Sequence, residues 1–310
     1  LSTENSYSFP LPEANGVYLI DIISRWDEDT YPSGIEKYTF TINIELTESY
    51  TLDREYYEPG DLVVVKGDYM DRDMNYTIAT DIYHQDLQFL PSAGSNYLFI
   101  PLMSKIEPGN YNLTITDPDY PDKVASLDIS VIHKDFDSQY LTTSGETASL
   151  RNKEAYAQLN EAFARGRSNM SLVPYWEGPF LRPVEGGRIS TEYGEIRYTN
   201  GDTVSSRHSG SDFAVPTGAL VYASHTGYVT LAEEQTVTGN TIFIDHGFGL
   251  LSQYYHLDKI YVTDGDFVNQ GDPIGEVGTT GFSTGPHLHF SIYSNGIYIN
   301  PWKLFEKAPF

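Results

Sequence analysis

The sequence of 310 residues has no cysteine, no long uninterrupted apolar run and few basic residues. The absence of cysteine excludes disulfides, cysteine-ligated metals and thiol catalysis. No stretch approaches the roughly 20 apolar residues of a membrane-spanning helix, so we expect no membrane-spanning segment. The 19 Lys and Arg residues face 43 Asp and Glu residues, for a net charge of −24. Such a chain repels phosphates, which excludes nucleic acid as a general partner.

The length and the distribution of histidine predict more than one domain. A single hydrophobic core usually stops growing at about 250–300 residues. His84 and His133 lie in the first part of the chain, and the other six of the eight histidines follow residue 175. We therefore expect a β-rich N-terminal region over residues 1–135, a linker over 136–174, and a second domain over 175–310 that carries the chemistry.

The N-terminal region has the pattern of a β-sandwich. Short segments rich in Val, Ile, Thr and Tyr are separated by turn residues, which predicts strands over 17–23, 38–46, 62–66, 76–82, 97–102, 111–116 and 124–132. Residues Pro108–Leu113 resemble the tyrosine corner of immunoglobulin-like domains. We expect an immunoglobulin-like module over about 48–133, preceded by an extra pair of strands. A generic β-sandwich would fit the same pattern.

One helix is predicted between the two parts, over residues 150–165. Its apolar residues Tyr156, Leu159 and Phe163 fall on one helical face. Gly166 stands where a C-terminal cap belongs. We expect this helix to be a spacer that packs on a neighbouring domain.

The second part is rich in glycine and β-branched residues and has no useful helical period. Val215–Val221 and Val268–Ile274 share the spacing V-x-x-G-x-x-[VI]. Two copies of a β-hairpin unit, as in a duplicated barrel-sandwich hybrid, would explain this repeat. The whole chain is therefore predicted to be all-β, apart from the one connecting helix.

A few residues of this second part could bind a metal. His208 and Asp212 lie four residues apart at the start of a strand-like run, and His256 ends another. His287 and His289 point to the same face if both belong to one strand. Zinc accepts imidazole nitrogen and carboxylate oxygen, and catalytic sites use three protein ligands. Asp212 with two of the four histidines would complete such a set, and the other two could act on water and the oxyanion.

The remaining histidines, His84, His133, His225 and His246, are expected to be hydrogen-bonded structural residues. A single histidine in a strand more often has that role than a catalytic one. His246 lies beside the turn residue Gly247.

Residues 177–305 resemble the catalytic domain of the LytM/lysostaphin-type zinc metallopeptidases, which cut peptide cross-links in bacterial peptidoglycan. The most specific match is Gly-x-x-x-Gly-Pro-His-Leu-His, which ends at His289. Gly194 and Arg197 fit the segment that opens this domain. The matching stretches are Arg207–Ala214, Gly239–Gly247, Tyr254–Leu257 and Gly278–Phe290.

The resemblance implies a role for each candidate residue. His208, Asp212 and His289 would bind one Zn²⁺ ion, and His256 and His287 would be the catalytic residues that act on the water. Tyr254 fits the family's tyrosine two residues before the catalytic histidine, and a packing role for it is at least as plausible.

The resemblance also implies the activity and its place. We expect a zinc-dependent endopeptidase that acts on peptidoglycan stem peptides or cross-bridges, with D,D-type cross-links favoured. It would work outside the cytoplasm, in the cell envelope, the periplasm or the medium, although no signal peptide or anchor is visible in the given chain. The N-terminal module could bind envelope partners.

Two other functions fit part of the evidence. A catalytically silent or latent LytM-like regulator of other cell-wall hydrolases would keep the fold. A carrier or phosphotransfer protein would share the barrel-sandwich architecture. A carrier needs a modifiable lysine at a hairpin tip, and Lys259, the only lysine in residues 208–302, does not lie in such a turn.

Overall fold

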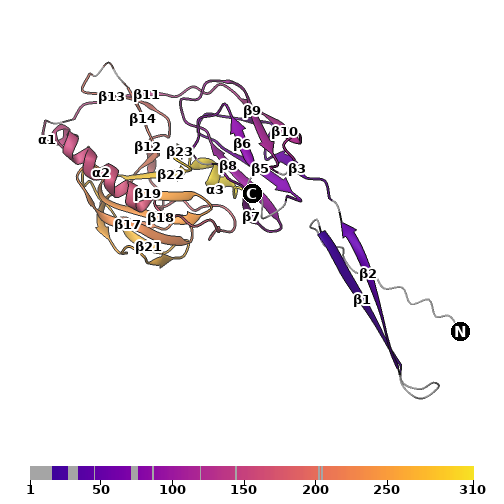
Figure 1. The fold of residues 1–310 in the computed structure, drawn as a ribbon. Helices are drawn as coiled ribbons and strands as arrows, with labels where there is room; N and C mark the ends of the chain where they lie inside the picture. Colours follow the sequence, from indigo (N-terminus) through magenta and orange to yellow (C-terminus); the bar gives the residue numbers. More distant parts are fainter. Residues whose placement is uncertain are drawn as a thin grey trace.

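β-Strands form most of the regular secondary structure, as predicted (Figure 1). The computed structural model describes residues 16–26, 34–44, 46–70, 76–85, 87–118, 120–143, 145–201, 203 and 205–310. Within these residues, no helix is both long enough and apolar enough to cross a membrane.

The first element that the structure describes is a long antiparallel hairpin. Strand β1 (Gly16–Trp26) pairs along its whole length with β2 (Gly34–Ile44). These are the two extra strands that the sequence predicts. The hairpin forms a two-stranded sheet of its own and projects away from the rest of the chain (Figure 1).

Two four-stranded sheets follow, with the strand orders β3-β5-β8-β7 and β4-β10-β9-β6. Every strand predicted here is present, and the short β3, β4 and β7 were missed. At the start of β9 the Tyr111 hydroxyl donates to the Glu107 carbonyl oxygen at 2.7 Å. This bond is the one expected of a tyrosine corner, and the immunoglobulin-like assignment stays a prediction. The strands are β3 (Ser49–Leu52), β4 (Tyr56–Tyr57), β5 (Leu62–Asp68), β6 (Thr77–Thr80), β7 (Leu90–Ser92), β8 (Ser95–Pro101), β9 (Gly109–Thr116) and β10 (Val124–Val131).

Strand β5 is buried on both faces, which explains its uninterrupted run of apolar residues. Val63 and Val65 belong to the core between the two sheets. Leu62 and Val64, which point the opposite way, join a second core that contains Phe248 of the C-terminal part. The N-terminal sandwich and the C-terminal part therefore share a hydrophobic core.

The linker contains a strand and two helices rather than one helix. It comprises β11 (Ser138–Leu141), α1 (Gly145–Ser149) and α2 (Lys153–Gly166). The predicted start at 150 is wrong, because Asn152 caps α2 by accepting a hydrogen bond from the Ala155 N–H at 2.8 Å. α2 buries Leu159 as predicted, but Tyr156 is 42% exposed.

Gly166 is not the cap beyond the helix that the sequence predicts. It is the last residue of α2, and Arg167 is the C-cap. A Cβ atom at Gly166 would lie 2.7 Å from Cδ2 of Phe243 and 3.1 Å from Cβ of Leu231. Glycine is needed here because the helix end approaches the C-terminal sheet closely.

The C-terminal part is built around a ten-stranded sheet in which β19 and β22 are central. β19 pairs with β18, β21 and β22, which explains the burial of its first eight residues. The elements are β12 (Arg188–Thr191), β13 (Ile196–Thr199), β14 (Ser206–Arg207), β15 (Ser211–Ala214), β16 (Leu220–Tyr222), β17 (Gly227–Gln235), β18 (Gly239–Gly247), β19 (Leu250–Ile260), β20 (Phe267–Val268), β21 (Pro273–Val277), β22 (Leu288–Ser294), β23 (Ile297–Ile299) and α3 (Trp302–Glu306).

The repeated motif in the sequence corresponds to a repeated local structure. Gly218 and Gly271 both have a left-handed backbone, with φ of 86° and 85°, and each precedes a strand. Those strands, β16 and β21, pair with each other antiparallel. The bonds across the pair are reciprocal: the Gly218 N–H donates to Val277 and the Gly271 N–H donates to Ala223. This exchange is what two copies of one hairpin unit would make.

Candidate active site

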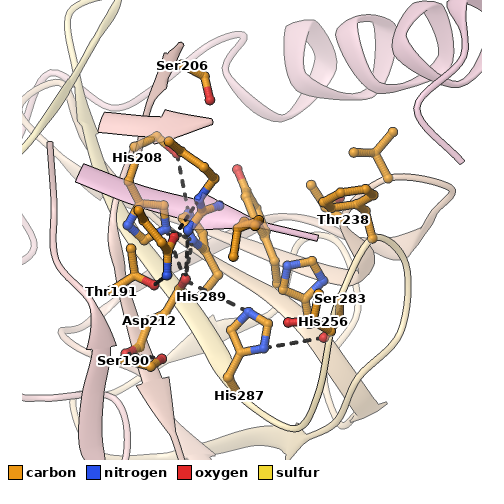
Figure 2. Close-up of a pocket in the computed structure, with 18 of the residues that line it drawn as sticks. Ser190, Thr191, Ser206, His208, Asp212, Thr238, His256, Ser283, His287 and His289 are labelled. Atoms are coloured by element: carbon orange, nitrogen blue, oxygen red, sulfur yellow. Dashed lines mark hydrogen bonds and ion pairs between the residues drawn. The ribbon is translucent and has the colours of Figure 1, made fainter. Parts of the chain in front are cut away.

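A cavity of about 610 Å³ opens over the C-terminal sheet. The linker, including Leu159 of α2, and the loop 282–287 both line it, and they meet where Leu159 and Phe282 belong to one buried cluster. All five predicted site residues line this cavity: His208, Asp212, His256, His287 and His289 (Figure 2).

Strand register brings together residues that lie far apart in the sequence. β15 pairs antiparallel with β22, and Asp212 lies directly opposite His289. Residues opposite each other on one face of a sheet have neighbouring side chains. Asp212 Oδ1 is 2.8 Å from His289 Nδ1 and 3.1 Å from His208 Nε2, and these two nitrogens are 3.0 Å apart.

The loop that carries His208 lies directly against β22. A Cβ atom at Gly210 would lie 2.1 Å from the carbonyl oxygen of Phe290, so only glycine allows this approach. The Glu192 carbonyl oxygen is 2.9 Å from Nδ1 of His208. Because a carbonyl only accepts, Nδ1 carries the proton, and Nε2 presents its lone pair to Asp212 and His289.

The surroundings of Asp212 keep its carboxylate ionised. Burial raises the pKa of Asp212, but the neighbouring His208 and His289 outweigh that effect and hold the pKa well below its usual range. Arg197 also lies 3.3 Å from Oδ2. For His289, burial is the main cause that lowers the pKa to about 4, so the ring is neutral near pH 7. A carboxylate and neutral imidazoles are the forms that bind metal.

His256 and His287 form the other side of the site. Their ring centroids are 4.8 Å apart. Nδ1 of His256 lies 2.8 Å from the Thr280 carbonyl oxygen, and Nδ1 of His287 lies 2.8 Å from that of Gly285. Both rings therefore hold a proton on Nδ1 and leave the Nε2 lone pair free to accept another. Nε2 of His287 faces Asp212 Oδ1 at 3.9 Å.

His256 has an unusual backbone. Its φ is 64°, in the left-handed region that non-glycine residues rarely occupy. It lies where the pairing of β18 with β19 shifts register. Burial is the main cause that lowers the pKa of His256 to about 3, and the neighbouring His287 and His289 lower it further. The fold thus holds a neutral imidazole in a strained position beside the cluster.

The cluster of His208, Asp212 and His289 fits a metal ion. Two imidazole nitrogens and one carboxylate oxygen converge, and they lie 2.8–3.1 Å apart. Ligands that bind one zinc ion at about 2.0–2.2 Å lie only slightly farther from one another, about 3–3.5 Å. The donor types and their convergence are those of a catalytic zinc site with three protein ligands.

Comparison with known families identifies this part of the chain. Residues 206–301 match the model of Peptidase family M23. They form an M23 peptidase domain. The resemblance to LytM/lysostaphin-type peptidases that the sequence suggests is thereby confirmed for the M23 domain.

Curated relatives match the M23 domain. Peptidoglycan DD-endopeptidase ShyA of Vibrio cholerae is 42% identical over 96 residues, which are 31% of this chain and 22% of ShyA. DD-carboxypeptidase/endopeptidase Mpg of Neisseria meningitidis is 42% identical over 102 residues, 33% of this chain and 24% of Mpg. The chain thus spans a third or less of the length of the curated relatives it matches.

One solved structure extends the match beyond the M23 domain. A Pseudomonas aeruginosa protein assigned to peptidase M23 is 25% identical, with a TM-score of 0.57, over 80% of this chain and 94% of its own. Residues 175–310 make up less than half of the chain. The matched region therefore includes much of the N-terminal part as well as the M23 domain.

Histidines that the sequence predicts to be structural lie away from the cavity. His225 and His246 are buried and contact Phe180. In His246, Nδ1 bonds the Thr226 carbonyl oxygen at 2.9 Å and Nε2 bonds the Ser252 hydroxyl at 2.7 Å. His133 is exposed and bonds Asp135, and His84 bonds the carbonyl oxygen of Gln85.

Two neighbouring tyrosines of β19 have opposite orientations. Tyr254 is buried in the core, where its hydroxyl accepts a hydrogen bond from the Ser224 N–H at 2.8 Å. Tyr254 therefore packs in the core and does not line the cavity. Tyr255 instead lines the cavity and stacks on His289, with centroids 4.9 Å apart. Tyr255 was not predicted to be a site residue, although strand alternation places it on the face opposite Tyr254.

Two arginines that line the cavity were not predicted to be site residues. Arg197, quoted only as part of a family motif, bonds Asp212 and also the Gln139 side chain at 3.0 Å. Arg151 reaches the cavity from the turn between α1 and α2. No local sequence signal indicates that Arg151 faces this cavity, because its position depends on how the linker docks.

Proposed function

We propose that this chain is a zinc-dependent endopeptidase that hydrolyses peptide cross-links of bacterial peptidoglycan, at D,D-type bonds. One observation carries the proposal: three metal-competent atoms converge beside two histidines whose Nε2 lone pairs are free. Three ligands and a flanking base are the components of metal-assisted peptide hydrolysis. The names of ShyA and Mpg support peptidoglycan as the substrate.

In this proposal His208, Asp212 and His289 hold the zinc ion. Bound zinc supplies Lewis acidity, which polarises a carbonyl and acidifies water. His256 and His287 are placed for the proton transfers: Nε2 of one of these rings accepts a proton from water, and the same proton then passes to the leaving amine. Arg197 keeps Asp212 oriented. Stacking on Tyr255 fixes the ring plane of His289.

We also propose where the protein works and how the chain divides. A peptidoglycan substrate places the enzyme outside the cytoplasm. Residues 1–135 would form the N-terminal region, with an immunoglobulin-like module at 48–133 that could bind envelope partners. Residues 136–174 would be the linker, and 175–310 the metallopeptidase domain.

The test is digestion of purified peptidoglycan by the full chain, followed by mass spectrometry of the soluble fragments. We expect conversion of cross-linked dimers to monomers, loss of this conversion with a chelator, and its return when zinc is added. The His287→Gln variant is the matched control for contaminating hydrolases, because it removes one proton-transfer residue only. If the zinc-loaded chain releases nothing beyond the His287→Gln background, the proposal fails and a regulator of other hydrolases takes its place.

A further inference from the structure

The candidate active-site cavity has a charge opposite to that of the whole protein. Four arginines line it, Arg151, Arg188, Arg197 and Arg207, and Asp212 is the single carboxylate among the described residues that line it. The chain as a whole carries −24. A cavity with an excess of positive charge attracts anionic groups, and a bound zinc ion would add to this attraction.

Arg197 and Arg207 already have partners within the protein. Arg197 bonds Asp212 and Gln139, and Arg207 donates to the Gly194 carbonyl oxygen at 2.9 Å. Arg188 is exposed to solvent, which satisfies its guanidinium. These three side chains therefore need no ligand to balance their charges or hydrogen bonds.

Arg151 is different. Its guanidinium lies 3.6 Å above the ring centroid of Phe282, on the loop that carries the catalytic histidine motif. Its Nε is buried and has no hydrogen-bond partner, and no ion pair to Arg151 is present among the described residues. Burial is the main cause that lowers the pKa of Arg151, and the nearby positive charge of Arg197 lowers it further. The Phe282 ring is thus the one contact that offsets this partly buried charge among the described residues, and an anionic ligand would stabilise it further.

We propose that Arg151 binds a free carboxylate of the substrate peptide beside the bond that is cleaved. This inference rests on the proposed function, because it places the peptide in the same cavity. A guanidinium is planar and presents paired donors that match the two oxygens of a carboxylate. The Phe282 ring covers one face of the guanidinium, so the donors of its edge remain for the ligand. Peptidoglycan stem peptides carry such carboxylates on D-glutamate and, where the diamino acid is diaminopimelate, on that residue as well.

The test uses cross-linked stem-peptide dimers whose carboxylates are free, or amidated on the glutamate or on the diamino acid separately. The full-length, zinc-loaded chain is compared with Arg151→Gln and Arg151→Lys. Arg165→Gln is the matched control, because Arg165 lies on α2, is exposed, and pairs with Glu233 outside the cavity. Melting temperature and zinc content are measured for each variant, so that a loss of folding or of metal is recognised.

We expect Arg151→Gln to lower kcat/KM on the free-carboxylate dimer by about 10- to 100-fold, the usual size of a charge-assisted hydrogen bond. The same variant should cleave one amidated dimer as well as the wild type does. That dimer identifies which carboxylate Arg151 binds. On the free-carboxylate dimer, kcat/KM of Arg151→Lys should fall between that of the wild type and that of Arg151→Gln. Arg165→Gln should match the wild type. The ratio of kcat/KM for the free-carboxylate dimer to kcat/KM for each amidated dimer decides the outcome. If this ratio is the same in Arg151→Gln as in the wild type, the proposal is overturned and the peptidase function stands.

A binding measurement separates this proposal from the proposed function. The metal-free chain cannot turn over the peptides, so their affinity can be measured by calorimetry. Tighter binding of the free-carboxylate dimer by the wild type than by Arg151→Gln supports the site even if no dimer is cleaved. Equal affinities of the wild type and Arg151→Gln for the free-carboxylate dimer would overturn it.

Discussion

The pocket histidines differ in which ring nitrogen is already used by the backbone. Carbonyl oxygens occupy Nδ1 of His208, His256 and His287, so each of these rings presents Nε2 to the cavity. His289 presents Nδ1 instead, at 2.8 Å from Asp212. His208 and His289 touch Oδ1 of Asp212, whereas His287 stays at 3.9 Å. This difference in distance separates proposed ligands from proposed proton-transfer residues.

Substitution of the two histidines of His-Leu-His should therefore have different effects. His289→Ala should lose bound zinc and activity together, because one of three protein ligands is gone. His287→Ala should keep about one zinc per chain and lose activity by at least about 100-fold, the usual contribution of a general acid or base. Elemental analysis of zinc and peptidoglycan digestion measure the two effects. Loss of zinc from both variants would show that the roles are wrongly assigned.

A second prediction concerns His246, which lies in the core and away from the metal cluster. Burial is the main cause that lowers the pKa of His246 to about 3 in the folded chain, against 6.5 in the unfolded chain. As the pH falls below about 6.5, the unfolded chain binds a proton on this ring that the folded chain excludes. His246 therefore destabilises the fold as the pH decreases, by up to about 1.4 kcal/mol per pH unit.

Chemical denaturation of the wild type and His246→Asn between pH 7 and pH 4 tests this. Asparagine keeps one donor and one acceptor but does not titrate, so the free energy of unfolding of the variant should fall less steeply with acid. The exposed His133→Asn is the control and should follow the wild type. Parallel slopes for His246→Asn and the wild type would contradict the prediction.

At the scale of elements, the sequence predicted what depends on local pattern. Short runs rich in Val, Ile, Thr and Tyr, bounded by turn residues, were enough to locate β1, β2, β5, β8, β9 and β10. The two-residue β4 is too short to carry a period. The interruption before α2 was missed because helix formers surround it, and only the Asn152 cap reveals it.

The candidate site was predicted through its motifs and not through its geometry. The residues of His-Ser-Gly-Ser-Asp and His-Leu-His were identified by resemblance to a family. Their meeting depends on the pairing of Asp212 with His289 across 77 positions, which no local pattern encodes. The approach of Arg151 to Phe282 depends in the same way on the docking of the linker.

The close approach of α2 to the sheet leads to a third prediction. Gly→Ala in a helix usually adds about 1 kcal/mol of stability. At Gly166 the new methyl group would meet Phe243 and Leu231 at 2.7 and 3.1 Å, and such overpacking costs about 1–3 kcal/mol. We expect Gly166→Ala to lower the melting temperature. Gly145→Ala in α1 is the matched control, because no atom lies within 4 Å of its Cβ position, and it should be neutral or stabilising.

At the scale of the whole molecule, the predicted parts are not independent. Phe99 of the sandwich lies 5.0 Å from Phe248 of the M23 domain, measured between ring centroids. Phe310, the last residue, stacks on Tyr97 of the sandwich at 3.8 Å. The sequence predicted the strands of the sandwich and the existence of a second domain, but not the contact between them. An apolar residue on a strand does not reveal which neighbour covers it.

This shared core predicts how the chain tolerates shortening. A chain of residues 175–310 keeps all five site residues but exposes Phe248 and Phe310, and it also loses the cover of α2 over Leu231 and Phe243. We expect this truncated chain to bind the dye ANS, to melt at a lower temperature and less cooperatively than the full chain, and still to take up zinc. Deletion of residues 1–45 is the control, because the β1–β2 hairpin forms a separate sheet. That deletion should leave the melting transition unchanged. A 175–310 chain that melts like the full chain would show that the sandwich is not needed for the stability of the M23 domain.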